Sequence, residues 1–217
     1  MELALAYELH TIMKNSKIKL LIVLVSALIL FFVITFFQKW DVTVAEKTAD
    51  DYRDKVKSIK KDYAKAKAEC PAIVNALKKS LPELQKNKLE TKVMLSYKLI
   101  ADCEYGSKNF ASAAQYYQKL IRYDPQVPLW HLLYAKSVMG DGDLGEALRS
   151  AHLAVQLDRT NYEANILEAR LLAKLNYTVR AIEAYQSALK HAPFKESKKV
   201  ENELNLLVDK YNQQSAN

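Results

Sequence analysis

The first strong feature of the chain is a continuous apolar segment near its N-terminus. It runs from Leu20 to Phe37 and contains only two weakly polar residues. At a helical rise of ~1.5 Å per residue, the segment covers roughly 27 Å, which matches the hydrocarbon core of a bilayer. Lysines flank it, and Trp40 follows in a position suited to the headgroup region. The pattern predicts a transmembrane helix over residues 18–38.

A cleaved signal peptide is the alternative interpretation of this segment. Signal peptides have a shorter apolar core and a small-x-small cleavage site, and the best candidate here, Thr43-Val44-Ala45, matches poorly. The natural start of the chain is also open. Met13 begins a stretch typical of a bacterial N-terminus, so residues 1–12 are either an upstream extension or a short amphipathic segment.

The flanking lysines predict how the helix is oriented. Lys14, Lys17 and Lys19 precede the apolar segment, whereas only Lys39 follows it closely. The positive-inside rule then makes residues 1–17 a short cytoplasmic tail, with the rest of the chain outside the cytoplasm, which in a bacterium means the periplasm. Widening the window to Arg53 evens the count, so a cytosol-facing domain is the alternative.

Residues 39–93 are expected to form a helical linker. Apolar residues recur there at alternating spacings of four and three, which gives one apolar face with a heptad period. This stripe consists of Ala45, Ala49, Tyr52, Val56, Ile59, Tyr63 and Ala66. It predicts either dimerisation through a coiled coil or a helix that packs on its own domain or a partner. Pro71 is expected to end this helix or to open a second one over residues 72–85.

From Met94 onward the chain repeats itself with a period of 34 residues. The period is carried by two ladders of mostly small residues, Ala113, Ala147 and Ala181, and Leu120, Ala154 and Ala188. Such a period is the signature of antiparallel helix pairs stacked side by side, because small residues allow close approach. The fold class is therefore expected to be all-α. Three repeats should span residues 94–127, 128–161 and 162–195, and a capping helix should follow within 196–217.

The repeat pattern resembles the tetratricopeptide repeat (TPR) family. Ala101, Ala135 and Ala169 occupy the small position of the first helix in that pattern, and Pro125 and Pro193 occupy its proline position. In this family the first helix of each repeat lines a concave binding surface. The resemblance therefore implies a groove formed by Lys98, Asp102, Tyr105, Leu132, Lys136, Met139, Ile166, Arg170 and Lys174. These residues would either contact an amphipathic or extended segment of acidic character or pack against the preceding helix.

The two cysteines, Cys70 and Cys103, both follow the apolar segment. In an oxidising compartment they could form a disulfide that ties the second linker helix to the first repeat. The alternative is two free, buried thiols.

Composition narrows the classes of function. With only 4 glycines and 5 prolines the chain is poor in turn residues, which disfavours sheets. The formal net charge is +7, but lysines and acids alternate, as on a solvated helical face and unlike a nucleic-acid patch. We find no phosphate-binding glycine loop, no metal-ligand spacing and no setting for a nucleophile. The sequence thus predicts a protein without catalytic activity, cofactor, metal or nucleic-acid partner.

The leading hypothesis is a membrane-anchored scaffold that binds protein partners. By analogy it would assemble or stabilise a bacterial envelope complex, such as a pilus, secretion or cytochrome-maturation complex. One alternative is a periplasmic chaperone-like helper near the translocation channel, and another is a cytosol-facing receptor.

Overall fold

The hydrophobic patterns described above correspond to an elongated, all-helical molecule. A computed structural model describes residues 16–215, with side chains for residues 23–213. Within that range it contains nine helices and no strand. They are α2 (Ser16–Ile59), α3 (Tyr63–Lys86), α4 (Glu90–Gly106), α5 (Phe110–Tyr123), α6 (Pro128–Asp141), α7 (Leu144–Leu157), α8 (Tyr162–Lys174), α9 (Thr178–His191) and α10 (Phe194–Ser215). The expected all-α class is confirmed.

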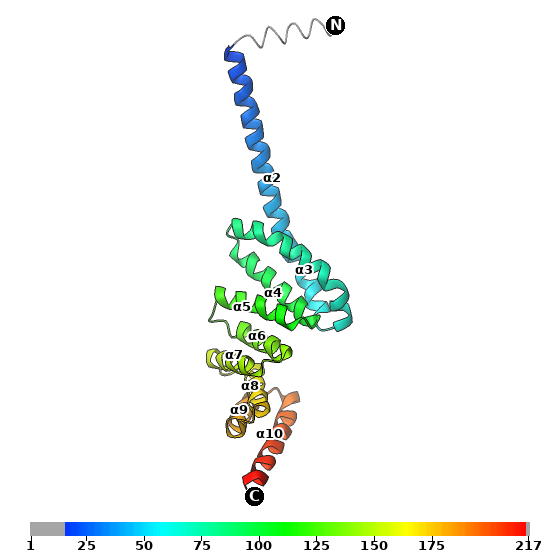
Figure 1. Cartoon of the computed structure of the whole chain (residues 1–217), viewed down its shortest axis with the longest axis vertical. Helices are drawn as coiled ribbons and strands as arrows, with labels where there is room; N and C mark the ends of the chain where they lie inside the picture. Colours follow the sequence, from blue (N-terminus) through cyan, green and yellow to red (C-terminus); the bar gives the residue numbers. More distant parts are fainter. Residues whose placement is uncertain (1–15, 216–217) are drawn as a thin grey trace.

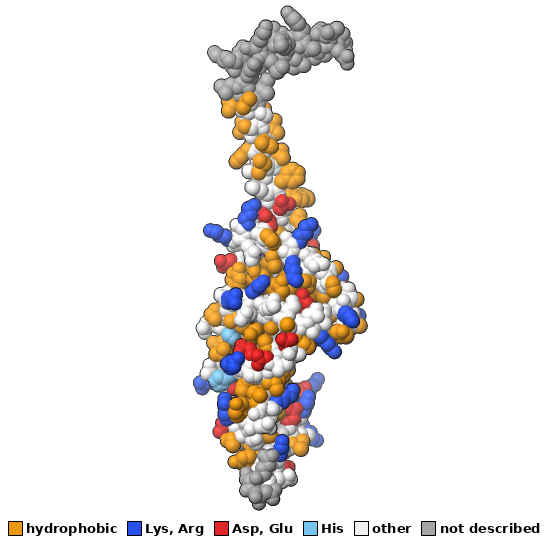
Figure 2. Space-filling view, viewed as in Figure 1, with side chains coloured by type: hydrophobic (Ala, Val, Ile, Leu, Met, Phe, Trp, Pro, Cys, Tyr) orange, Lys and Arg blue, Asp and Glu red, His pale blue; other side chains and the backbone are white. Residues whose placement is uncertain are grey.

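Helix α2 joins the apolar segment to the folded domain without a break. It is 44 residues long, which corresponds to about 66 Å. Its apolar half is exposed, with Phe32 at 68% and Phe36 at 64%, and it projects from the stack as a single shaft (Figures 1 and 2). Among the described residues α2 alone is long and apolar enough to cross a membrane, a test that a signal sequence also passes. The expected tail of residues 1–17 lies almost wholly outside the described residues.

The stripe that follows the apolar segment packs largely inside the chain, except for Tyr63, which begins α3 and is 44% exposed. Ala45, Ala49, Val56 and Ile59 are at most 4% exposed and belong to a core shared with α3 and α4. Burying this stripe covers the apolar face that α2 would otherwise expose to water. A dimer through the same face would require these contacts to be broken, so the structure shows the intramolecular alternative.

The prediction that Pro71 would end one helix or open the next is wrong. The chain instead turns at residues 60–62, where Asp62 caps α3 by accepting a hydrogen bond from the Lys65 amide at 3.2 Å. Pro71 and Pro82 both lie inside α3. Each proline removes one helical hydrogen bond, but both are exposed, so the freed carbonyl can bind water. The buried side chains of Ile73, Val74 and Leu77 on the other face hold α3 in place.

The turn between α2 and α3 lies directly against the end of α4. A Cβ atom at Gly106 would be 2.8 Å from the Lys60 carbonyl oxygen, so only glycine allows this approach. The linker is therefore a helical hairpin docked on the first repeat, and it extends the stack by two helices.

Three helix pairs, α4–α5, α6–α7 and α8–α9, follow one another along the stack (Figure 1). The alanines that carry the period are fully buried where these helices meet, including Ala101, Ala135, Ala169, Ala113, Ala147 and Ala181. Helix α4 begins at Glu90, four residues before the expected repeat start at Met94. The small residues thus act as predicted, by letting neighbouring helices approach closely.

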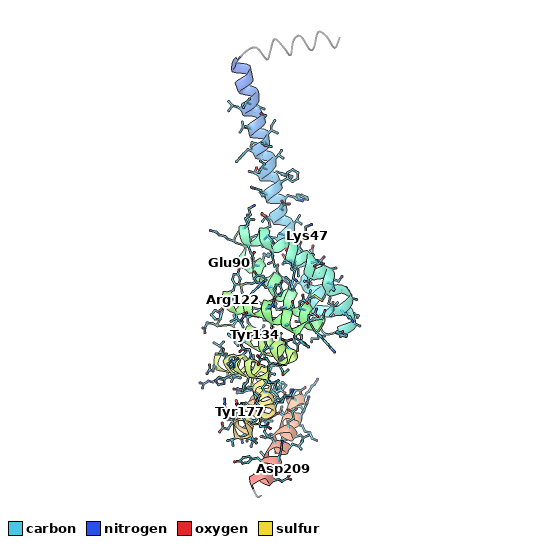
Figure 3. All side chains as sticks on the ribbon, in the orientation of Figure 1. Lys47, Glu90, Arg122, Tyr134, Tyr177 and Asp209 are labelled. Atoms are coloured by element: carbon cyan, nitrogen blue, oxygen red, sulfur yellow. A yellow bond between two sulfur atoms is a disulfide. The ribbon has the colours of Figure 1, made fainter. Side chains whose placement is uncertain are left out.

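Helix α10 covers the last pair. Its Val200 is fully buried in a cluster with Tyr185 and Ala188 of α9. Figure 3 shows the resulting order, with Lys47 and Glu90 at the end of the stack next to the shaft and Asp209 near the opposite end.

Candidate functional site

A groove runs along the face formed by the first helix of each pair. It encloses about 320 Å³ and is lined by Tyr105, Lys136, Met139, Tyr162, Glu163, Ile166, Leu167, Arg170, Glu196 and Lys199. These residues come only from α4, α6, α8 and α10, and none belongs to α5, α7 or α9. We call this feature the α8 groove. Its floor is apolar and its rim is charged, which suits an amphipathic protein segment.

The apolar floor is fixed by packing. Ile166 and Leu167 are 6% and 7% exposed. The Tyr105 ring lies edge-on to Phe110 with centroids 5.4 Å apart, and burial raises the pKa of the Tyr105 hydroxyl. At the rim, Lys136 of α6 donates to Glu163 of α8 at 2.6 Å. A partner segment would therefore meet a preformed surface.

Helix α10 forms the far wall of the groove, and an ion pair holds it there. Arg170 donates two hydrogen bonds to the Glu203 carboxylate, at 2.9 and 2.8 Å, and the Tyr185 hydroxyl donates a third at 3.1 Å. These bonds lower the pKa of Glu203, with Arg170 as the main cause. Burial, together with the nearby Glu203, raises the pKa of Tyr185 to about 12. A bidentate ion pair of this kind fixes both the orientation of α10 relative to α8 and the distance between them.

A second network ties the linker to the first pair through Asp102. Asp102 is 4% exposed, and its carboxylate accepts hydrogen bonds from Lys60 at 2.9 Å, Lys98 at 2.7 Å and the Tyr117 hydroxyl at 2.8 Å. Burial acts to raise the pKa of Asp102, but the two lysines outweigh it and the pKa lies below its ordinary value. Burial and the Asp102 charge strongly raise the pKa of Tyr117.

Comparisons with known proteins identify the architecture. No family model matches the chain, and no curated protein matches its sequence. Among solved structures, the first TPR domain of human RPAP3 aligns with a TM-score of 0.51 at 20% identity, covering 57% of this chain and 95% of that domain. The first TPR of Spaghetti (RPAP3) bound to an HSP90 peptide aligns at 0.50 and 20% identity, covering 54% and 94%. The MamA protein aligns at 0.57 and 13% identity, covering 79% and 88%. The chain has a TPR fold.

Within this TPR fold, five of the nine predicted groove residues line the α8 groove. They are Tyr105, Lys136, Met139, Ile166 and Arg170. Lys98 lines a different pocket, and Lys174 is exposed outside the groove. Leu132 is 2% exposed and packs inside the stack, and Asp102, at 4% exposure, borders the same pocket as Lys98 instead of the α8 groove.

Helix α10 contributes to this site in a way that the sequence did not predict. The pattern places Glu196, Lys199 and Glu203 in a segment that it predicts only as a capping helix. The signal was present in the period, because Glu203 stands 34 residues after Ala169. Helix α10 therefore occupies the place of a first helix in a fourth TPR, which is why it borders the groove.

Cys70 and Cys103 are joined in a disulfide between α3 and α4, with their Cα atoms 5.4 Å apart. Cys70 borders a larger cavity of about 650 Å³ between α3 and the α4–α5 turn, which includes Lys67, Lys78 and Glu104. This cavity contains no residue of α6, α8 or α10 and is separate from the α8 groove. Within the described part of the chain, no group of three His, Cys, Asp or Glu residues could hold a metal ion.

Proposed function

We propose that this chain is a membrane-anchored TPR scaffold that holds a segment of a partner protein in the α8 groove. The groove carries the proposal, because one preformed cavity combines an apolar floor with charged groups of both signs. The TPR of Spaghetti is described as bound to an HSP90 peptide, which supports a protein segment as the class of ligand. At 20% identity this likeness gives no guide to the partner's sequence.

The membrane part of the proposal rests on α2. Its exposed apolar half is followed by Trp40, and the helix continues into the buried stripe without a loop. An anchor of this kind would hold the TPR stack at a fixed distance from the bilayer. We further propose that the anchor lies in a bacterial inner membrane, with the stack in the periplasm, where the scaffold assembles or stabilises an envelope complex.

A photo-crosslinking residue in place of Met139 is expected to capture one dominant product in native membranes. Met139 lines the groove and is only partly buried, so a reactive group there would face the bound segment. The same residue in place of Gln186, which is exposed on α9 outside the groove, serves as the matched control. A broad mixture of clients from Met139 would favour a chaperone-like helper. Equal capture from both positions would contradict the groove as the binding site.

A topology reporter fused after Asn217 is expected to be active outside the cytoplasm. The lysines before the apolar segment outnumber those immediately behind it, which favours this orientation. A paired set of reporters should be used, one active only in the cytoplasm and one active only in the periplasm. Activity of the cytoplasmic reporter alone would leave the scaffold proposal standing as a cytosol-facing receptor, but would exclude the envelope complex.

A further inference from the structure

A second pocket lies where the end of α2 meets α4. It encloses about 270 Å³ and is lined by Arg53, Lys57, Lys60, Leu95, Lys98, Leu99 and Asp102. We call it the basic pocket. Two of its four cations, Arg53 and Lys57, come from α2 and a third, Lys60, from the turn that follows it, so three lie outside the three repeats. We propose that the basic pocket binds an acidic side chain of the same partner segment that occupies the α8 groove, an inference that rests on the proposed function.

The charge balance of the basic pocket favours an anion. Lys60 and Lys98 are held by the buried Asp102, and Arg53 pairs with Asp50 at 2.7 Å. Asp50 is itself shared with Lys92. Among the described residues Lys57 forms no ion pair, so one cation at the pocket is available to a ligand. A carboxylate placed there would be attracted by all four cations, and the single buried acid is already neutralised by two of them.

The floor of the pocket indicates which anionic group fits. Leu99 is 3% exposed, and Leu95 is partly buried. Apolar walls reduce the local dielectric constant and strengthen charge attraction inside the pocket. A glutamate side chain matches this arrangement, because its methylene groups can contact the leucines while its carboxylate reaches Lys57.

Position along α2 separates this site from the membrane. Arg53 lies 13 residues and Lys60 lies 20 residues beyond Trp40. At ~1.5 Å per residue these distances are about 20 and 30 Å. The Debye length is only about 8 Å at physiological ionic strength, so lipid headgroups would neither reach the pocket nor act strongly on it.

The basic pocket and the α8 groove can serve one ligand because α4 contributes to both. Lys98 lines the pocket and Tyr105 lines the groove, seven residues apart on α4. Residues with that spacing lie two turns apart on one helical face, at a rise of about 10 Å. A short peptide could therefore lay apolar residues in the groove and extend an acidic side chain toward α2.

The test uses the full chain in detergent micelles and a short fluorescent peptide in which glutamate and leucine alternate. We expect the anisotropy titration to give a dissociation constant about fivefold weaker for Lys57→Gln than for the unmodified protein. The matched control is Lys55→Gln, which makes the same charge change on α2 but at a residue that pairs with Glu69 of α3. A peptide with glutamine in place of glutamate should show no difference between Lys57→Gln and the unmodified protein.

Several outcomes would overturn this assignment. Equal affinity of the Lys57→Gln and Lys55→Gln variants, or no binding of the glutamate peptide to the unmodified protein, would do so. Displacement of the peptide by inorganic tripolyphosphate, together with equal binding of the glutamine peptide, would show a free-anion site instead. These results are independent of the crosslinking from Met139. The proposal for the basic pocket can therefore be wrong while the proposed scaffold function is still correct. If crosslinking from Met139 fails as well, the proposed function falls with it.

Discussion

Replacement of Asp102 by asparagine is expected to lower the free energy of unfolding by about 3 kcal/mol. The carboxylate is buried and accepts hydrogen bonds from Lys60, Lys98 and Tyr117. Asparagine fills the same space but leaves both lysines without a counter-charge, and the side chains of these lysines are only 29% and 31% exposed. Chemical denaturation followed by circular dichroism measures the difference.

Tyr117→Phe provides the matched control for this variant. It removes one of the three hydrogen bonds but keeps the charge, so about 1 kcal/mol should be lost. A loss for Asp102→Asn no greater than that of Tyr117→Phe would contradict the view that charge pairing holds α2 on α4.

The pairing of Asp102 with Lys60 and Lys98 also predicts how the stability of the protein depends on pH. The pKa of Asp102 is lower in the folded state than its ordinary value, because Lys98 and Lys60 favour the charged form over the effect of burial. The stabilisation is therefore complete above the unfolded-state pKa of about 3.9 and is lost as the pH falls through the folded-state pKa. Below about pH 4 the unmodified protein should lose stability more steeply than Asp102→Asn.

The architecture of the stack could be predicted because it depends on a repeated local requirement. Each repeat needs small residues where helices cross, and Ala113, Ala147 and Ala181 satisfy it at intervals of 34. Such a periodic pattern can be recognised in the sequence without knowing which distant parts of the chain contact one another. The groove was partly predictable for the same reason, since Lys136 and Arg170 occupy the same place in successive repeats.

The features that the sequence did not predict depend on contacts between elements. Pro71 looks like a helix boundary when only local propensity is considered, but the buried face of α3 and its cap at Asp62 outweigh the lost hydrogen bond. Asp102 stands in a series of groove positions, yet it is buried and pairs with Lys60, which comes from the turn between α2 and α3, outside the repeats. Tertiary packing decided both cases, and neither residue carries a sequence signal of it.

Loss of the Cys70–Cys103 disulfide is expected to lower the free energy of unfolding by about 3 kcal/mol. The bond closes a loop with a sequence separation of 33, and a crosslink of that span restricts the unfolded chain substantially. Equilibrium unfolding with and without reductant measures the effect on the unmodified protein. The double variant Cys70→Ser/Cys103→Ser is the control and should not respond to reductant. Equal stability in both conditions would contradict the expectation, as would free thiols in protein isolated from its native compartment.

The position of the disulfide also predicts that its loss and the loss of the Asp102 charge affect stability in a coupled way. Cys103 and Asp102 are neighbours on α4, one bonded to α3 and the other paired with Lys60 at the end of α2. Together they fasten both helices of the linker to the first repeat. Because the two links share one helix turn, reduction and Asp102→Asn should not be additive, and each should change the effect of the other by at least about 0.5 kcal/mol. Strictly additive losses would mean that the shaft and the stack are held together chiefly by the buried apolar stripe of α2.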